Sequence, residues 1–193
     1  MKKIIGILVA VTAVILLVLA YFGLFAPVKI SEDVAGPFWL VYEKYTGEYK
    51  NIGPVMDKLY NDLKKDGIET TKGFGIYYDN PEKVDKDKLR SAVGCIIDQK
   101  DENKITEIGK KYNLKQYPAT KSAICKFPYK GMPSIIIGII KVYPELMKHM
   151  NDFKYPEVPI MEVYDKPGEF IQYIAAIGLD KKYFDSFLDE IRK

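Results

Sequence analysis

A run of apolar residues at the N-terminus constrains this chain more than any other feature. From Ile4 to Ala26 the sequence IIGILVAVTAVILLVLAYFGLFA contains no charged residue. As a helix rising about 1.5 Å per residue it would reach about 35 Å, enough to cross a hydrocarbon core about 30 Å thick. Residues 1–26 are therefore predicted to be a transmembrane anchor, which has to be set aside before the fold of the remainder is considered.

Two lysines indicate how this segment is oriented. Lys2 and Lys3 precede the apolar run, and positive residues are enriched on the cytoplasmic side of membrane spans. A single-pass protein is therefore expected, with its N-terminus in the cytoplasm and its domain outside the cytoplasm. The alternative is a cleaved signal peptide with its cleavage site at 18–20. Because the apolar run continues past that site, the sequence favours the uncleaved anchor.

The rest of the chain has the composition of a globular protein. Hydrophobic residues make up 48% of the sequence and charged residues 28%, with a formal net charge of +3. The sequence has no basic stripe and no zinc-finger spacing, so no nucleic-acid partner is expected. Cys95 and Cys125 lie inside apolar runs without C-x-x-C spacing, and they are predicted to be buried free thiols, with a single disulfide as the alternative. Neither a metal nor another cofactor is expected.

The hydrophobic pattern after residue 37 predicts the order strand, helix, strand, strand, written twice. Residues 27–37 are expected to be a linker. The strands are predicted at 38–45, 73–78, 91–98, 119–127, 158–165 and 169–177. These elements divide the chain into a first repeat at 38–98 and a second repeat at 117–177.

Apolar residues at i, i+3 and i+4 predict the helices. The first repeat carries this spacing from Val55 to Leu63. In the second repeat a long helix follows Pro133, and Pro144 is expected to kink it or to split it in two. A polar helix across 101–112 joins the repeats, and an amphipathic helix across 179–192 closes the chain.

The two repeats contain nearly the same turn, GIYYDNPEKV at 75–84 and MEVYDKPGEF at 161–170. Both read Tyr-Asp-x-Pro, beginning at Tyr78 and Tyr164. The Asp can accept a hydrogen bond from the backbone two residues on, and the Pro presets φ for the turn. This interpretation aligns Tyr78 with Tyr164 and the apolar Ile76 with the acid Glu162. The alternative is a coincidence between two ordinary hairpins.

The first repeat resembles the GyrI-like domains, which also occur as effector-binding domains of multidrug-responsive transcription regulators. The resemblance rests on Tyr45, Gly47 and Tyr49 before the helix and on GIYYDNP after it, while PIMEVYD in the second repeat is similar to the family's strand that carries an acid beside an aromatic. It covers 38–177 and places the domain at 38–193. It implies an α+β fold with one antiparallel sheet, helices on one face and a groove between the repeats.

The resemblance also implies that the groove binds small amphipathic molecules, often aromatic cations. The family's acid on the penultimate strand of the second module matches Glu162. Aromatic rings stack on flat or cationic ligands. The alternative for each candidate aromatic residue is that it packs in the core, as most aromatic residues of strands do. The aromatic residues expected near the groove are Tyr164, Tyr42, Tyr45, Tyr78 and Trp39.

The residues around Glu162 also make this acid unusual, apart from the resemblance. Because residues two apart in a strand share a face, Ile160, Glu162 and Tyr164 point the same way. If that face is buried, the pKa of the carboxyl group rises unless a positive partner compensates, and a cationic ligand would be such a partner. If the face is exposed, Glu162 is an ordinary surface acid.

Two other functions stay open. One is a protein-interaction module at the membrane. The other is a hydrolase of small electrophilic compounds, as in some family members, with Glu162 and the hydroxyl of Tyr164 or Tyr42 as the reacting groups. Binding is expected rather than catalysis, because the sequence has no Ser-His-Asp order, metal cluster or Gly-rich phosphate loop. The order of membrane segment and domain also resembles an animal receptor for selective autophagy of the endoplasmic reticulum. That role is not expected, because the chain ends at Lys193 without that receptor's disordered tail.

Overall fold

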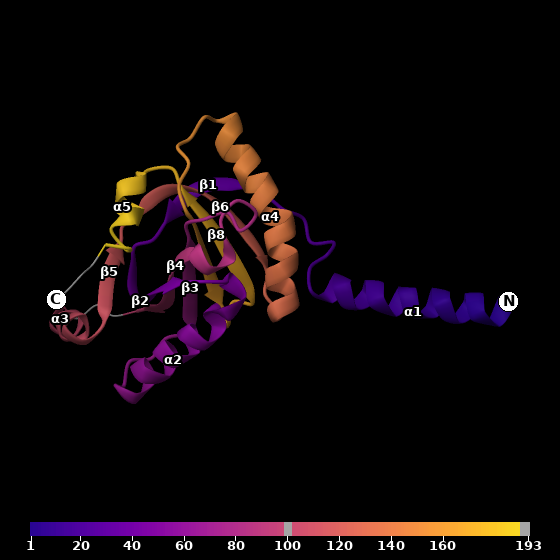
Figure 1. The fold of residues 1–193 in the computed structure, drawn as a ribbon, viewed down its shortest axis with the longest axis horizontal. Helices are drawn as coiled ribbons and strands as arrows, with labels where there is room; N and C mark the ends of the chain where they lie inside the picture. The colour runs from indigo at the N-terminus through magenta and orange to yellow at the C-terminus, as the bar shows by residue number, and fades with distance from the viewer. Residues whose placement is uncertain (99–101, 190–193) are drawn as a thin grey trace.

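The structure is a computed structural model that describes residues 1–98 and 102–189. Its strands are β1 (Ser31–Ala35), β2 (Phe38–Thr46), β3 (Lys72–Tyr77), β4 (Arg90–Ile97), β5 (Asn113–Tyr117), β6 (Thr120–Pro128), β7 (Ile160–Asp165) and β8 (Phe170–Ala176). Its helices are α1 (Lys2–Tyr21), α2 (Ile52–Lys65), α3 (Glu102–Lys111), α4 (Met132–Asp152) and α5 (Lys181–Asp185). The predicted α+β class is confirmed (Figure 1).

The strands form one antiparallel sheet in the order β1-β6-β8-β7-β3-β4-β2-β5. Read inward from either edge, the order is the same, since β5, β2, β4 and β3 correspond to β1, β6, β8 and β7. Each edge strand pairs with the other half of the molecule, β1 with β6 and β5 with β2. The two halves therefore exchange their first strands, which ties them into a single sheet.

The edge strands β1 and β5 are missing from the predicted repeats. The segment 27–37, expected to be a linker, contains β1, and β5 follows the connecting helix α3. β1 has the sequence SEDVA, and only Ala35 in it is buried. Short edge strands bury little and carry charged residues, so they lack the apolar run or clear alternation that marks an inner strand.

The curl of the sheet brings the two exchanged segments together. Gly36 follows β1 with φ of +87°, a conformation that L side chains rarely adopt. A Cβ atom on Gly36 would lie 2.7 Å from the carbonyl oxygen of Pro118, which links β5 to β6. The two strand-to-strand connections are thus in contact, and glycine is required where they meet.

Helices α2 and α4 cover one face of the sheet, and the short α5 packs on the other. Met56 of α2 lies against Gly73, and Gly138 of α4 lies against Tyr173. The strand register puts Gly73 and Tyr173 on the same face. Phe187, which follows α5, packs on Tyr42 of the opposite face. The closing helix, expected at 179–192, ends at Asp185, and residues 190–193 of that prediction lie outside the described part of the chain.

Two local predictions have clear outcomes. Pro144 lies inside α4, which runs from Met132 to Asp152 as one helix and is not split in two. Cys95 and Cys125 are both buried and free, as expected from their apolar surroundings.

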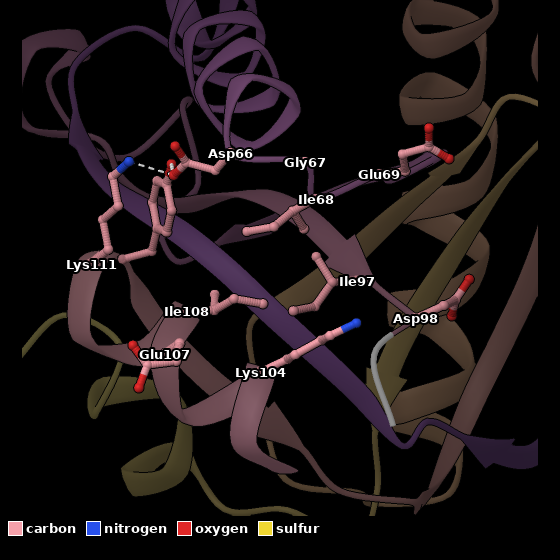
Figure 2. Close-up of a pocket in the computed structure, with 11 residues that line it drawn as sticks. Asp66, Gly67, Ile68, Glu69, Ile97, Asp98, Lys104, Glu107, Ile108 and Lys111 are labelled. Atoms are coloured by element: carbon pink, nitrogen blue, oxygen red, sulfur yellow. Dashed lines mark hydrogen bonds and ion pairs between the residues drawn. The ribbon is translucent and has the colours of Figure 1, made fainter. Parts of the chain in front are cut away.

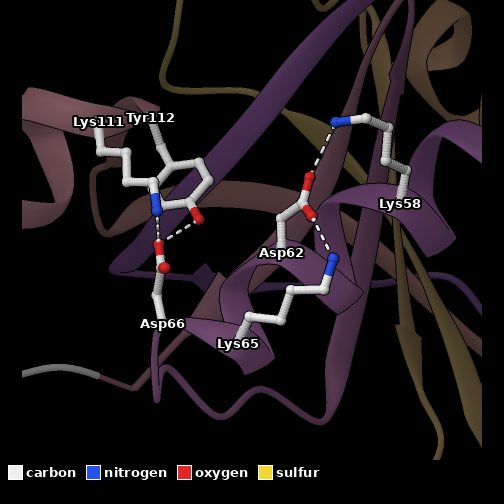
Figure 3. A network of polar contacts seen from close by, with 6 residues as sticks. All are labelled: Lys58, Asp62, Lys65, Asp66, Lys111 and Tyr112. Carbon is white, nitrogen blue, oxygen red and sulfur yellow. Dashed lines mark hydrogen bonds and ion pairs between the residues drawn. The ribbon is translucent and has the colours of Figure 1, made fainter.

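Ion pairs fix the position of α3 beside the end of α2. Asp66, just past α2, accepts hydrogen bonds from the Lys111 ammonium and the Tyr112 hydroxyl (Figure 3). A separate pair of contacts joins Asp62 to Lys58 and Lys65 on the exposed side of α2. These contacts are solvent-exposed, so they position the surface of the domain and stabilise it only modestly.

The N-terminal helix α1 has no buried residue and extends away from the domain (Figure 1). By length and composition it can cross a membrane, although a signal sequence passes the same test. The helix stops at Tyr21, before the end of the apolar run. The residues that follow turn back onto the domain, where Gly23 is buried against the ring of Phe127.

Candidate functional site

The central strand β7 carries a buried acid. All residues of β7, with the sequence IMEVYD, are buried, and Glu162 is 1% exposed. Glu162 lies opposite Gly75 of β3 and Tyr173 of β8. Because these partners lie on the face covered by α2 and α4, the Glu162 carboxyl group lies on that face as well. It lies in the middle of the sheet, where the two halves meet.

Tyrosine hydroxyls hold both carboxylate oxygens. Tyr143 of α4 donates to Oε1 at 2.7 Å, and Tyr164 of β7 donates to Oε2 at 2.8 Å. The Tyr77 hydroxyl lies 2.9 Å from that of Tyr164. Each half of the molecule contributes at least one hydroxyl to this chain of hydrogen bonds, with Tyr77 coming from the first half.

A fourth tyrosine completes the group, which we call the Glu162 cluster: Glu162, Tyr77, Tyr143, Tyr164 and Tyr173. The Tyr173 ring packs edge-on against Tyr143 with centroids 5.8 Å apart. Its hydroxyl is buried and has no hydrogen-bond partner within the described residues. The carboxyl group is thus enclosed by aromatic rings, and one further polar atom beside them is unsatisfied.

Burial controls the ionisation of the cluster. Loss of solvent raises the pKa of Glu162 to about 7, against the hydrogen bonds from Tyr143 and Tyr164, which lower it. No Lys, Arg or His pairs with Glu162 among residues 1–98 and 102–189. Burial also raises the pKa of Tyr143 and of Tyr164 far above the ordinary value, so both remain protonated donors. The site is therefore an acid that is about half ionised at neutral pH and that pairs with no positive side chain in the described part of the chain.

The structure brings only part of the predicted site together. Tyr164 contacts Glu162 directly, as its place two residues along the strand predicts. Tyr42 lies on the opposite face of the sheet, where its ring is 5.1 Å from Phe187. Trp39 packs at the edge of the smaller core under α2, and the Tyr45 hydroxyl lies beside Gly47 at the end of β2.

The alignment of Tyr78 with Tyr164 is wrong by one residue. Tyr77, not Tyr78, shares the face of Tyr164, because the register pairs Tyr77 with Ile160 and Gly75 with Glu162. Tyr78 points to the other face, and its hydroxyl donates to the carbonyl oxygen of Phe184 at 2.7 Å. The counterpart of Glu162 in the first half is therefore Gly75 rather than Ile76, and the side chain of Tyr77 fills the space beside this glycine, since a Cβ atom there would lie 2.7 Å from the Tyr77 hydroxyl oxygen.

Sequence reasoning missed three members of the Glu162 cluster. Tyr77 was obscured by the neighbouring Tyr78 in the matched turn. In the sequence, Tyr173 on β8 looks like any aromatic residue of a core strand. Its position opposite Glu162 follows only from the pairing of β7 with β8. Tyr143 lies on the apolar stripe of α4, where a tyrosine indicates core packing unless the facing residue is known. Only Tyr77 could have been found from the sequence, because the two-residue period of a strand puts Tyr77 and Tyr78 on opposite faces.

Two surface cavities lie away from the cluster. One, of about 410 Å³, opens between the end of α2 and α3 and is lined by Asp66, Asp98, Glu107 and Lys104 among others (Figure 2). The other, of about 310 Å³, lies between α3 and the edge formed by β2 and β5, and it includes Tyr42. In the first cavity the Asp66 carboxylate is exposed and accepts hydrogen bonds from Lys111 and Tyr112.

No family model matches the sequence. Testis-expressed protein 264 of Homo sapiens is 27% identical over 174 residues, which cover 83% of this chain and 54% of that protein. Its Mus musculus homolog is 27% identical over 131 residues, covering 65% of this chain and 41% of the homolog. The chain therefore spans about half the length of these relatives.

Two solved structures share the fold. The C-terminal domain of EcmrR has a TM-score of 0.52 at 12% identity, covering 80% of this chain and 98% of that domain. SAV2435 bound to tetraphenylphosphonium has a TM-score of 0.51 at 10% identity, covering 82% of this chain and 99% of SAV2435. The chain therefore shares its overall fold with these two proteins.

Proposed function

We propose that the domain binds a small amphipathic cation at Glu162, between its two halves, and that α1 anchors it to a membrane. The observation that carries the binding proposal is a carboxyl group 1% exposed whose partners in the described structure are tyrosine hydroxyls. An ionised carboxylate in such a place is costly unless a cation compensates it. The ligand would be that cation.

The rings around Glu162 suit such a ligand. Aromatic faces attract organic cations, and the attraction is stronger where water is excluded. The structure of SAV2435, which has the same fold, contains tetraphenylphosphonium, a hydrophobic cation with four phenyl rings around its positive phosphorus. Its likeness to this chain supports the class of ligand, and the Glu162 cluster supports the place.

Binding requires the cluster to open. Because Tyr143 and Tyr164 occupy both carboxylate oxygens, a ligand can reach Glu162 only when one of these side chains rotates away. The unsatisfied Tyr173 hydroxyl next to them offers a hydrogen bond to a displaced tyrosine or to a polar group of the ligand. Affinity should also rise with pH through about 7, since the cation binds the ionised form of Glu162.

The hydrolase alternative has one observation in its favour. A carboxyl group with a pKa of about 7 lies 2.8 Å from the Tyr164 hydroxyl, and a general acid or base works best near the operating pH. Turnover of an aryl ester that disappears in Glu162→Gln would support catalysis over binding.

Thermal unfolding of the full chain in nanodiscs, with tetraphenylphosphonium as the probe, tests the binding proposal. A ligand at 100 times its dissociation constant should stabilise the native state by about 2.7 kcal/mol. Triphenylphosphine oxide controls for aromatic bulk without charge. Glu162→Gln should abolish the cation-dependent shift, whereas Glu43→Gln, an exposed acid on the same sheet, should keep it. Equal shifts in wild type and Glu162→Gln would refute the assignment of Glu162.

A further inference from the structure

The first half of α4 exposes a continuous apolar strip. Its members lie on one side of the helix, at the spacing i, i+4, i+7 and i+8. They are Met132 (62% exposed), Ile136 (53%), Ile139 (43%) and Ile140 (68%), which we call the α4 strip. The buried side of the same helix already packs on the sheet through Gly138 and Val142. The α4 strip is therefore a second apolar surface that the core does not use.

Neighbouring helical surfaces are polar by contrast. In the second half of α4 the exposed positions include Glu145, Lys148 and Asn151. On α2, which covers the same face of the sheet, the exposed positions include Asp57 and Lys58. Within α2 and α4 the exposed apolar side chains gather at the N-terminal end of α4, whereas α2 exposes the single ring of Tyr60 and the far end of α4 is followed by Phe153. A gathered apolar patch of this kind marks a contact surface.

That end of α4 lies where α1 leaves the domain. The Lys141 ammonium donates to the carbonyl oxygens of Leu24 and Ala26, each at 2.6 Å. Gly23, packed on Phe127, fixes the same connection from the other side. In Figure 1, α1 extends from the side of the domain that α4 occupies, and α4 runs across the direction of α1. Phe25, in the connection, is itself 67% exposed.

We propose that the α4 strip and Phe25 lie in the interfacial layer of the membrane that α1 crosses, and that they hold the domain against the lipid surface. The proposal rests on the membrane part of the proposed function. If α1 crosses a bilayer, then α4, which runs across the direction of α1 near the point where α1 leaves the membrane, lies close to the plane of the membrane surface. Interfacial helices bury an apolar face in this way, about 5–10 Å into the boundary of headgroups and acyl chains.

Lipid fits this place better than a second copy of the chain. The connection between α1 and the domain is short and held by Lys141, so the α4 strip stays close to the bilayer whatever else is present. The same helix carries Tyr143, whose hydroxyl binds Glu162. The membrane contact would therefore position one wall of the Glu162 cluster beside the surface where amphipathic molecules accumulate.

Depth-dependent fluorescence quenching tests the proposal on the full chain. Single cysteines replace Ile136, Ile140, Lys148 or Asp57, each labelled with an environment-sensitive dye, in nanodiscs that hold one chain each. Val11→Cys in α1 reports on the anchor, and the unsubstituted chain gives the background from the buried Cys95 and Cys125. Quenchers are nitroxides attached to lipid and iodide in the aqueous phase.

Dyes at 136 and 140 should be quenched several-fold more by lipid nitroxides than dyes at 148 and 57, and should be protected from iodide. If dyes at 136 and 140 are quenched by iodide while the dye at 11 is in lipid, α1 is an anchor and the α4 strip does not dock. If the dye at 11 is also in water, the anchor itself is refuted. Protection that appears only in crowded vesicles, and not with one chain per nanodisc, would identify a second copy as the occupant and overturn the proposal.

Discussion

The Tyr143 hydroxyl lies 2.7 Å from the Glu162 carboxylate and joins α4 to the centre of the sheet. This bond connects the helix of the second half with the strand next to the first half. Since its acceptor is a buried acid, the strength of the link depends on the ionisation of Glu162. The stability of the fold and the state of the candidate site are therefore coupled.

The stability of the domain should fall as pH rises. Burial raises the pKa of Glu162 from 4.5 to about 7, so between these values the folded state holds a proton that the unfolded state has released. The free energy of unfolding should decrease through this window by up to about 1.4 kcal/mol per pH unit and then level off. Urea unfolding from pH 4.5 to 8.5, followed by the fluorescence of the single Trp39, measures this slope. Glu162→Gln should flatten it, and an unchanged slope in that variant would assign the effect to another group.

Removing the hydroxyl of Tyr143 or Tyr164 should destabilise the domain. Tyr143→Phe leaves the buried carboxylate with one donor fewer, at an expected cost of about 1.5–3 kcal/mol at pH 8. The cost should be smaller at pH 5, where Glu162 is protonated, and the pKa of Glu162 should rise further in the variant. Tyr173→Phe is the matched control, because its hydroxyl has no partner in the described structure and its loss should be nearly neutral. Equal losses in the two variants would show that ring packing, not hydrogen bonding, determines the effect.

The inner strands and the face that Glu162 shares with its strand neighbours could be predicted from local sequence. The period of two along β7 places Glu162 with Ile160 and Tyr164, and the strand register confirms that they share a face. The period does not determine whether that face is buried; the structure buries it, and burial raises the pKa of Glu162. The order of strands and helices in each half follows from runs long enough to carry a clear pattern. These features depend on residues close together in the chain.

The remainder of the site depends on contacts between distant segments. The sequence match aligned Tyr78 with Tyr164, whereas pairing of β3 with β7 fixes Tyr77 there, and a shift of one residue reverses the face. Tyr143 reaches Glu162 only because α4 packs on β6 and β8, next to β7. The exchange of β1 and β5 is likewise invisible locally, since each pairs with a strand of the other half.

Because α4 packs closely on the sheet, the cost of a substitution at Gly138 should depend on the Tyr173 hydroxyl. A Cβ atom there would lie 2.2 Å from the Tyr173 hydroxyl oxygen, so Gly138→Ala should destabilise the domain by about 1–3 kcal/mol. Adding Tyr173→Phe removes the clashing atom and should restore part of the loss, which a double-mutant cycle measures. Gly53→Ala on α2, where nothing lies within 4 Å of the new atom, should be neutral or stabilising by up to about 1 kcal/mol. Additive losses in the cycle would mean that α4 moves as a whole instead.

The first Tyr-Asp-x-Pro turn is held by a charged pair whose loss should be measurable. Asp79 accepts hydrogen bonds from the Arg90 backbone N–H at 2.8 Å, from Nε at 2.9 Å and from Nη2 at 2.7 Å, and its side chain is 9% exposed. Asp79→Asn should cost about 1–3 kcal/mol, because a two-pronged pair with a carboxylate is lost.

The hydrogen bonds from Arg90 lower the pKa of Asp79, so the contribution of Asp79 to stability is present at neutral pH and is lost as pH falls through the lowered pKa. This pH dependence is opposite in sign to that of Glu162. Asp85→Asn in the same loop removes an exposed ion pair with Lys88 and should change the free energy of unfolding by less than about 1 kcal/mol. If Asp85→Asn costs as much as Asp79→Asn, general loss of negative charge rather than the Arg90 contact would explain the result.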